Sequence, residues 1–219
     1  MARKTAEEAA ITRQRILAAA TELFSETGVI ETTLEHIAQR ANVSRGAIYW
    51  HFRGKQDLLK AIFDEQPLPL ESTVPKDLRL AAAWQQLHNC LVETISKEIP
   101  RRLAEIMMYQ GAFRGDTAAH QQRLASVRRR FMQQLRIVLE NAVSAGELSS
   151  SLNIQRAMEF FGTSIAGLLF DCLQKDVNSV ESVHSTLNVL WHVLISPPES
   201  FLVKDSPTKP AQVIRPVLE

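Results

Sequence analysis

The sequence predicts an all-α protein in which two blocks of helices are joined by a proline-rich linker. Apolar residues recur at spacings of three and four along most of the chain, whereas the two-residue alternation of half-buried strands is nearly absent. The nine prolines gather in 67–75, at position 100 and in 197–216. Because proline interrupts helices and stiffens connections, these positions separate the helical blocks.

Three segments follow from the proline positions. We expect an N-terminal domain at 1–66, a larger second domain at 76–196 and a flexible tail at 197–219. With 219 residues and a hydrophobic content of 45%, the chain is long enough for one or two domains with a substantial core.

The first block contains patterns for four helices. The first helix is expected at 8–27, where Gly28 supplies the left-handed residue that commonly ends a helix. The second begins at the tetrapeptide TTLE, in which Thr32 and Glu35 have the spacing of a capping box. It is short and closes near Ala41.

A tight turn separates the second helix from a third. Asn42 tolerates the left-handed conformation that the turn needs, and Ser44 can cap the helix that follows. A fourth helix is expected at 55–65. Two short helices that meet at a turn of three or four residues form a helix-turn-helix, and here the motif spans about 33–52.

Apolar residues decide which side of this motif faces the protein. The residues expected to point inward are Leu34, Ile37, Ala38, Ala41, Val43, Ile48 and Phe52. Since Ile48 and Phe52 occupy one face of the third helix, Arg45, Gly46 and Tyr49 must lie on the opposite, outward face.

Charge is distributed unevenly, although the net charge is only +1. Between His36 and Lys55 there are four cations and no acidic residue, which suits the phosphates of a duplex. A second basic group lies near the N-terminus, at Arg3, Lys4, Arg13 and Arg15. The competing interpretation is a helical hairpin whose aromatic residues cover the protein's own core, and the absence of acids disfavours it.

Each outward residue has a possible role on DNA. Arg45 can donate two hydrogen bonds to a guanine, which discriminates against other bases by ~1–3 kcal/mol. Gly46 would let the helix backbone approach closely, and the Ala47 methyl can contact thymine. Tyr49 and His51 can donate to phosphate oxygens.

Two further phosphate contacts are expected beside the third helix. Lys55 adds a cation at the start of the fourth helix. The start of the second helix, near Thr33, offers free backbone N–H groups to another phosphate.

The segment TTLEHIAQRANVSRGAIYWHFRGKQDLLKAIFDE resembles the N-terminal DNA-binding domain of TetR-family transcriptional repressors. That family shares a glycine-containing recognition helix followed by the pattern Tyr-x-His-Phe-x-x-Lys-x-x-Leu, which here runs from Tyr49 to Leu58. The resemblance covers about residues 10–65. The opening MARKT and the segment RGAIYWHF are similar to the AcrR branch, whose members repress multidrug efflux pumps.

The resemblance implies a set of DNA-binding residues and a dimer. Together with the roles above, the set is Thr33, Ser44, Arg45, Gly46, Ala47, Tyr49, Trp50, His51 and Lys55. One departure is Gly54, where many relatives carry a Ser, Thr or Asp that caps the fourth helix, so the placement of Lys55 stays open. A dimer would present two recognition helices ~34–36 Å apart to a palindromic operator.

The second block is predicted to contain amphipathic helices near 76–98, 101–113, 118–145, 153–174 and 180–195. The last two are the most apolar, and Gly162, Ala166 and Gly167 in the first of them would let another helix approach closely. Such a pair is too apolar to leave in water, so we expect it to form a homodimer interface.

The family resemblance also implies that the second block binds an effector. Its first helices interleave aliphatic residues with methionines and aromatics, which suits a pocket for small apolar or amphipathic ligands. The expected ligand-binding residues are Trp84, His88, Leu91, Ile106, Met107, Gln110, Phe113 and Phe131. For any one of them, ordinary core packing is the competing interpretation.

These observations predict a ligand-responsive repressor of a multidrug efflux operon and of its own gene. Two alternatives are an all-α protein-interaction module and a transcriptional activator unconnected with efflux. An enzyme is disfavoured because the sequence has no glycine-rich phosphate loop, nucleophile elbow or HExxH motif. No cofactor or metal is expected, since neither the six histidines nor the two cysteines have metal-ligand spacing.

The sequence gives no sign of a membrane partner. No segment approaches the ~20 apolar residues that cross a bilayer, and the opening MARKTAEEAA lacks the apolar region of a secretory signal. We therefore expect a cytoplasmic protein in which Cys90 and Cys172 stay reduced.

Overall fold

The structure is a computed structural model, and it describes residues 2–75, 77–109, 118–174 and 179–203. Within these ranges every regular element is a helix, and the one pairing of extended backbone is an isolated bridge between Leu152 and Leu202. The predicted all-α fold is thus confirmed. None of the helices in these ranges is both long enough and apolar enough to span a membrane.

The described residues form two compact units. The first comprises the chain up to Leu68 together with Glu98–Ser126, and the second comprises Pro69–Lys97 together with the chain from Val127 on. Helix α6 (Glu98–Tyr109), which was expected in the second domain, therefore belongs with the N-terminal helices. The predicted domain limits at 66, 76 and 196 divide the chain into consecutive segments. Each compact unit instead combines two stretches that are separate in the sequence.

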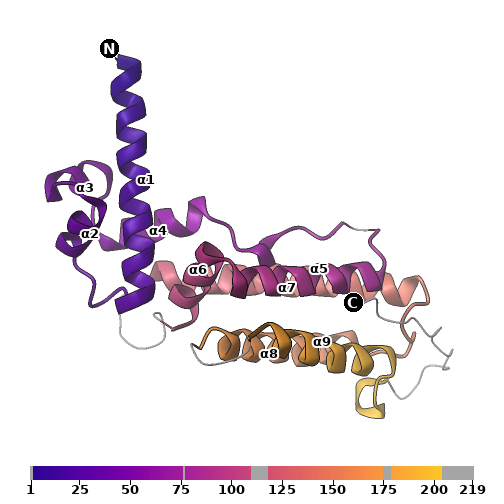
Figure 1. Cartoon of the computed structure of the whole chain (residues 1–219). Helices are drawn as coiled ribbons and strands as arrows, with labels where there is room; N and C mark the ends of the chain where they lie inside the picture. Colours follow the sequence, from indigo (N-terminus) through magenta and orange to yellow (C-terminus); the bar gives the residue numbers. More distant parts are fainter. Residues whose placement is uncertain (1, 76, 110–117, 175–178, 204–219) are drawn as a thin grey trace. The chain divides into compact units, whose positions relative to one another are not determined.

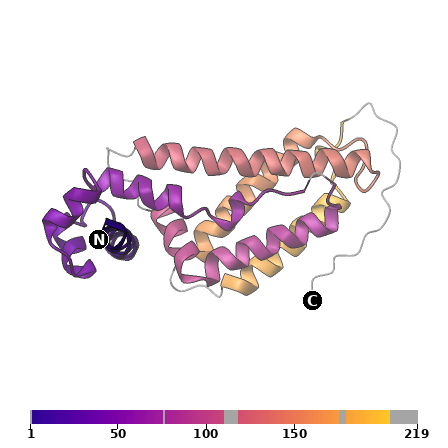
Figure 2. The same cartoon turned by 90° about the horizontal axis from the view of Figure 1, so that it is seen from above.

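The first unit is built around the long helix α1 (Ala2–Thr27). Beside it lie α2 (Leu34–Ala41) and α3 (Arg45–His51), and Figures 1 and 2 show both on the same side of α1. The fourth helix, α4 (Lys55–Glu65), packs on α1 as well.

A continuous apolar core joins these helices. The side chains of this core that are buried deepest are Ile16, Leu17, Phe24, Ile37, Ile48, Leu58, Leu59 and Ile62. Burying each such side chain stabilises the fold by about 1.5–3 kcal/mol. Ala38 and Ala41 are buried on α2 as predicted, whereas Leu34 is only half-buried.

The connection between α1 and α2 corrects the predicted cap. Gly28 has a φ of 93°, so it ends α1 in the left-handed region as expected. The N-cap of α2, however, is Thr33, whose hydroxyl accepts from the His36 N–H at 3.1 Å. Thr32 is buried instead, and its hydroxyl donates to the Gly28 carbonyl at 2.7 Å. The predicted capping box is wrong by one residue because Thr32 is needed to tie the loop to α1.

The turn between α2 and α3 is fixed from both ends. Asn42 has a φ of 51°, which confirms the left-handed turn, and the Ser44 hydroxyl accepts from the Ala47 N–H at 3.2 Å. From α1, Arg15 donates to the Ala41 carbonyl at 2.7 Å and to the Asn42 carbonyl at 3.2 Å. These bonds satisfy carbonyls that the end of a helix leaves free.

Helix α4 begins without a side-chain cap. Its N-cap, Gly54, makes no capping bond, and Asp57 instead accepts from the Arg53 N–H at 3.1 Å. A carboxylate in the first turn also interacts favourably with the helix dipole. The predicted helix at 55–65 is confirmed with these bounds.

Carboxylates at the end of α1 bind arginines from two other helices. Glu26 contacts Arg40 of α2 at 3.4 Å and Arg102 of α6 at 3.3 Å, and Glu22 contacts Arg40 at 2.9 Å. Arg102 also donates to the Ser25 hydroxyl at 3.0 Å. Exposed ion pairs of this kind contribute little stability each, so their main effect is to orient α2 and α6 on α1.

The second unit contains α5 (Leu80–Ser96), the later part of α7 (Ala118–Ser144), α8 (Ile154–Cys172) and α9 (Ser179–Ile195). Helices α8 and α9 lie side by side (Figure 1). Their shared core with α5 is aromatic: the Trp84 ring centroid lies 6.0 Å from that of Phe161 and 5.6 Å from that of Trp191.

Two short 3₁₀ turns complete this unit, η1 (Pro69–Glu71) and η2 (Glu199–Phe201). Residues 197–203 of the predicted tail pack against the start of α8: the Asn153 N–H donates to the Phe201 carbonyl at 2.7 Å. Residues 204–219 lie outside the described ranges.

The small residues of α8 have two different environments. A Cβ added to Gly162 would lie 2.7 Å from the Met132 sulfur of α7, so this glycine permits packing within the chain. Ala166 and Gly167 are exposed, and a Cβ at Gly167 would meet no atom within 4 Å. Only the latter pair remains available for the predicted approach of another helix.

Candidate nucleic-acid interface

The outward face of α3 carries large side chains that the fold leaves exposed. Tyr49 is 50% exposed and Trp50 is 73% exposed, while Ile48 on the opposite face is fully buried. Arg45 and Gly46 are exposed as well. Two adjacent exposed aromatic side chains beside an exposed arginine make this face suited to a partner.

Arg45 and Tyr49 form a pair one helical turn apart. The Arg45 guanidinium donates from Nη2 to the Tyr49 hydroxyl at 3.1 Å and lies 5.5 Å from the centre of the Tyr49 ring. The pair restricts where the arginine can point, while its remaining N–H groups stay available. Because the Tyr49 hydroxyl accepts this bond, its own hydrogen can still be donated to a phosphate.

The fold itself does not require glycine at position 46. A Cβ added there would meet nothing closer than the Ser44 hydroxyl at 3.7 Å, an ordinary contact, and the φ of Gly46 is not positive. Alanine in a helix is more favourable than glycine by roughly 0.8–1 kcal/mol. The glycine therefore costs stability without an internal packing reason, which points to close approach by a molecule from outside.

A hollow beside α3 brings the starts of two helices together. It is lined by Thr33, Leu34, Glu35, Arg45, Arg53, Gly54, Lys55, Gln56 and Asp57. Backbone N–H groups at the starts of α2 and α4 and two guanidinium groups make it suitable for a phosphate. Two carboxylates also line it, and that of Asp57 is engaged by the Arg53 N–H.

Lys55 has a structural role that the sequence pattern did not indicate. Its Nζ donates to the carbonyl oxygens of Val29 and Ile30, at 2.8 Å each. Burial lowers the pKa of the Lys55 ammonium below its ordinary value, although nearby Glu31 opposes this. Two of its three N–H groups thus hold α4 against the loop that precedes α2, and one remains for a phosphate.

His51 lies at the end of α3, half-buried, with its ring 4.5 Å from that of Trp50 in an edge-to-face arrangement. Burial lowers the pKa of His51, and the positive charge of Arg13 lowers it further. The imidazole is therefore mainly neutral at neutral pH, so it can donate one hydrogen bond to a phosphate but adds no charge.

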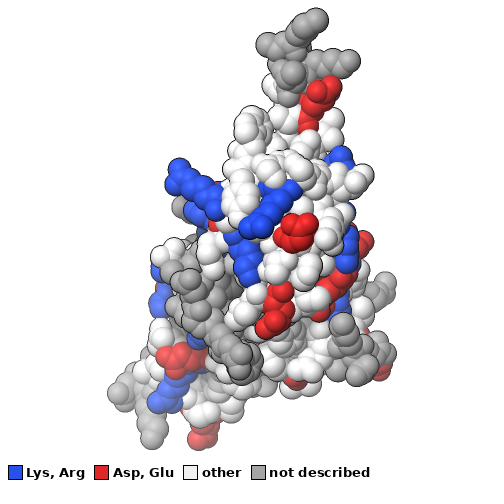
Figure 3. Space-filling view, turned by 90° about the vertical axis from the view of Figure 1, so that its left-hand side faces the viewer, with Lys and Arg blue, Asp and Glu red and all other residues white. Residues whose placement is uncertain are grey.

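Two arginines of the predicted N-terminal basic group are committed inside the unit. Arg13 donates to the Glu65 carboxylate at 2.8 Å and lies over the Phe52 ring, 5.1 Å from its centre. Arg15 is bonded to the carbonyls that end α2. The side chains of Arg3 and Lys4 lie outside the described part of the chain. Figure 3 shows Lys and Arg side chains on the face of the molecule that carries α2 and α3, with acidic side chains next to them.

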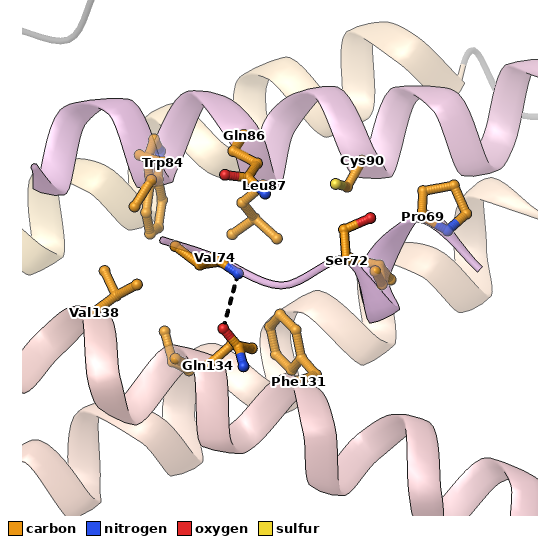
Figure 4. A pocket seen from close by; sticks show the side chains of 13 residues that line it. Pro69, Ser72, Val74, Trp84, Gln86, Leu87, Cys90, Phe131, Gln134 and Val138 are labelled. Atoms are coloured by element: carbon orange, nitrogen blue, oxygen red, sulfur yellow. Dashed lines mark hydrogen bonds between the residues drawn. The ribbon is translucent and has the colours of Figure 1, made fainter. Parts of the chain in front are cut away.

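Of the six predicted ligand-binding residues that the structure describes, two line an apolar pocket in the second unit. Trp84 and Phe131 lie in its wall, together with Pro69, Leu70, Ser72, Val74, Ala83, Gln86, Leu87, Cys90, Gln134, Leu135 and Val138 (Figure 4). The pocket encloses about 60 Å³ between α5, α7 and the segment before α5.

The other predicted ligand-binding residues lie elsewhere. His88 is half-buried beside His184, with ring centroids 5.6 Å apart, and Leu91 is fully buried in α5. Ile106 and Met107 are buried in α6, within the first unit. Gln110 and Phe113 lie outside the described residues.

Comparison with known proteins identifies the family. Residues 16–62 match the family described as "Bacterial regulatory proteins, tetR family". The chain is 35% identical over 209 residues to the HTH-type transcriptional regulator SrpR of Pseudomonas putida, covering 95% of this chain and 97% of SrpR. The chain belongs to the TetR family.

Other TetR-family members match along most of the chain. The HTH-type transcriptional regulator AcrR of Shigella flexneri is 36% identical over 176 residues, which cover 77% of this chain and 81% of AcrR. Among solved structures, SmeT in complex with triclosan has a TM-score of 0.70 at 26% identity, covering 95% of this chain and 99% of SmeT. SmeT is described as the repressor of the Stenotrophomonas maltophilia multidrug efflux pump SmeDEF.

NalD of Pseudomonas aeruginosa is a further structural neighbour, with a TM-score of 0.67 and 26% identity, covering 91% of this chain and all of NalD. It is described as the secondary repressor of the MexAB-OprM multidrug efflux pump. These comparisons place the chain among TetR/AcrR-type transcriptional regulators, several of which control efflux pumps, and its relatives are regulators rather than enzymes.

We predict that Gly46→Ala makes this TetR-family protein slightly more stable and weakens its binding to DNA. The added methyl meets no internal atom closer than 3.7 Å and improves helix propensity, so the melting temperature should stay equal or rise. The same methyl would hold the α3 backbone away from the groove, and we expect roughly tenfold weaker binding, equivalent to about 1.4 kcal/mol. Thermal unfolding and fluorescence anisotropy on one preparation test both parts. Unchanged DNA affinity would contradict close approach at Gly46.

We predict that Lys55→Met lowers both stability and the salt dependence of DNA binding. Losing the bonds to Val29 and Ile30 should destabilise the protein by about 1–3 kcal/mol. Losing one phosphate contact should reduce the slope of log K against log salt concentration by about 0.9.

The control for Lys55 is Lys60→Met, which removes an exposed lysine of α4 whose ion-pair partner is Asp64. Lys60 does not line the hollow, so this variant should keep the salt slope of the unaltered protein. If Lys55→Met lowered stability but left the slope unchanged, Lys55 would be a positioning residue without a phosphate contact.

Proposed function

We propose that the protein is a ligand-responsive repressor of a multidrug efflux operon and of its own gene. It binds a palindromic operator as a homodimer and leaves the operator when an apolar effector occupies the second unit. The observation that carries this proposal is the near full-length similarity to SrpR combined with an α3 surface that the fold leaves free.

The efflux assignment is supported by what the neighbours regulate. SmeT and NalD are both described as repressors of multidrug efflux pumps, and both cover more than nine-tenths of this chain. One relative from Escherichia coli, 32% identical over 180 residues, is named as a probable repressor of the acrEF/envCD operon. Transferring this role to the present chain is the proposal.

The DNA contacts follow from the exposed groups of the first unit. Arg45, steadied by Tyr49, would read a guanine, and Gly46 would bring the α3 backbone to the floor of the major groove. Contacts to phosphates come from Thr33, Ser44, Tyr49, His51 and Lys55, while Ala47 and Trp50 add apolar contacts to bases and sugars. The phosphate contacts set the register of α3, and the base contacts supply specificity.

Dimerisation is assigned to the exposed faces of α8 and α9. Phe170 of α8 is 42% exposed and Val189 of α9 is 63% exposed, and Ala166 and Gly167 lie on the outward side of α8. Apolar and small side chains on neighbouring helices suit packing against a second copy. A palindromic operator then follows, because two identical α3 helices read two identical half-sites.

Effector control is assigned to the apolar pocket lined by Trp84 and Phe131. One of the SmeT structures is a complex with triclosan, which supports a small apolar ligand in this group of proteins. An effector shifts the protein between two forms only by its difference in affinity for them, and a difference of about 3 kcal/mol would weaken DNA binding roughly 100-fold.

The proposed function predicts binding to DNA directly upstream of the protein's own gene. The purified protein should bind an inverted repeat there with an affinity that falls steeply with salt concentration. The probe 1-naphthol, a compact aromatic molecule with one hydroxyl, should act as an apolar effector and weaken the binding. Deleting the gene should raise transcription of an adjacent transporter operon. No binding to any inverted repeat near the promoter, even at low ionic strength, would rule the proposal out.

The role of the dimer can be separated from that of the DNA surface. Val189→Glu should give a folded monomer that binds the palindrome much more weakly, because each half-site is then read alone. Ile99→Glu places the same charge at a 52% exposed position of α6 and should leave the mass in solution unchanged. Light scattering and anisotropy measure the two effects.

A further inference from the structure

We propose that effectors enter the second unit by displacing the segment 69–74, here called the strap, and that they replace its hydrogen bond to α7. This inference rests on the proposed function, because it names how the effector site is opened. The effector class is a compact, mainly apolar molecule with one group, such as a hydroxyl, that both donates and accepts a hydrogen bond.

The pocket is too small for a drug-sized effector as it stands. It measures about 60 Å³ and is partly open to solvent, whereas pockets that hold drug-sized ligands measure roughly 300–1,000 Å³. A ligand of that size can therefore occupy it fully only if part of the wall moves. The wall has three parts: helix α5, helix α7 and the strap, which contributes Pro69, Leu70, Ser72 and Val74.

The strap is the part of this wall that is not a long helix, although its 3₁₀ turn η1 packs on α5. Ala83 and Trp84 of α5 and Leu135 of α7 are buried and belong to long helices, which are held by backbone hydrogen bonds along their length. In the strap, Pro69, Leu70 and Val74 are half-buried, and Ser72 is exposed. Pro69 in the strap lacks an N–H group, and Pro67 and Pro75 flank the strap, so this segment does not continue as a helix with a bond at every residue.

A side-chain hydrogen bond links the strap to α7. The Val74 N–H donates to the Gln134 side-chain carbonyl at 3.0 Å, and Figure 4 shows this bond spanning the space between the strap and α7. A net hydrogen bond of this kind contributes about 1 kcal/mol, which an apolar ligand can exceed by burying its own surface.

An ion pair provides a second link between the strap and α7. Arg130 Nη1 lies 3.5 Å from Glu71 Oε1, and the arginine side chain is 61% exposed while the glutamate side chain is only 1% exposed. Moving the strap outward would break this pair and hydrate the Glu71 carboxylate, so water would offset part of the lost attraction.

The chemistry of the opened bond defines the ligand. Once the strap moves, the Val74 N–H and the Gln134 carbonyl each lose a partner inside a largely apolar pocket, where an unpaired polar group costs about 1–3 kcal/mol. A hydroxyl inserted between them can accept from Val74 and donate to Gln134. Trp84, Leu87 and Phe131 surround this position with apolar surface that suits an aromatic or aliphatic body.

The strap also connects the pocket with the DNA-binding helices through the chain itself. It begins at Pro69, four residues after α4 ends at Glu65. Helix α4 is held to the loop before α2 by Lys55 at its start and to α1 by Glu65 at its end. A displaced strap would therefore act first on α4, the helix that contacts α1 and the loop before α2.

Hydrogen exchange tests this inference in the absence of DNA, with naphthalene and 1-naphthol as probes. Ligands usually slow exchange where they bind, but displacement of the strap predicts the opposite at Val74. With naphthalene bound, the Val74 N–H should exchange about fivefold faster, corresponding to loss of a bond of about 1 kcal/mol. With 1-naphthol, the increase should be smaller, because the hydroxyl takes over as acceptor.

The variant Gln134→Leu removes the acceptor and keeps the size of the side chain. Without ligand, exchange at Val74 should already be about fivefold faster than in the unaltered protein, and naphthalene should add no further increase. The preference for 1-naphthol over naphthalene should also be lost. Gln133→Leu, at the neighbouring exposed position of α7, should behave like the unaltered protein.

Slower or unchanged exchange at Val74 with naphthalene bound would overturn the inference, and so would a failure of both probes to bind. The two proposals fail separately. If Val74 exchange rises but 1-naphthol does not release the operator, the strap is displaced as inferred and the proposed effector control is wrong. If the operator is released without faster exchange at Val74, the effector acts through another wall.

Discussion

The outward face of α3, which carries Arg45, Gly46 and Tyr49, depends on how α2 and α3 are held against α1. Ile37 and Ala41 from α2 and Ile48 from α3 are buried in one core, and the turn between the helices is fixed by the left-handed Asn42. Successive residues of a helix point about 100° apart, so a slip of one residue in α3 would bury Tyr49 and expose Ile48. This packing, rather than any property of Arg45 itself, decides which side chains of α3 are exposed.

Several basic side chains hold this arrangement in place. Lys55 bonds two carbonyls of the loop before α2, Arg15 bonds the carbonyls that end α2, and Arg13 joins Phe52 to Glu65. These bonds occupy several cations of a chain whose net charge is only +1, while Arg45 and Arg53 remain exposed beside α3. The surface is small, and accurate placement compensates for its modest charge.

Much of this could be predicted from the sequence because it depends on local patterns. The end of α2, the turn at Asn42, the Ser44 cap that starts α3 and the bounds of α4 each follow from residues within a few positions of one another. The predictions that failed concern side chains whose environment is set by residues far away in the sequence. Thr32 is drawn into the core by Gly28 and Leu23, Gly162 is used by Met132, and the bonds of Lys55 require a loop 25 residues away. The pocket was only partly predicted for the same reason: periodicity marks Trp84 and Phe131 as buried or half-buried, but the strap that faces them has no periodic pattern.

Guanine methylation interference tests most directly whether the packing of α2 and α3 places Arg45 against a guanine in the major groove. Methylating N7 of the contacted guanine should prevent binding of the unaltered protein at one symmetry-related position in each half-site. The Arg45→Ala protein, compared at a concentration that restores binding, should lose interference at that position and keep the pattern of phosphate protection. If the interference pattern of the variant matched that of the unaltered protein, the account of the α3 surface would be contradicted.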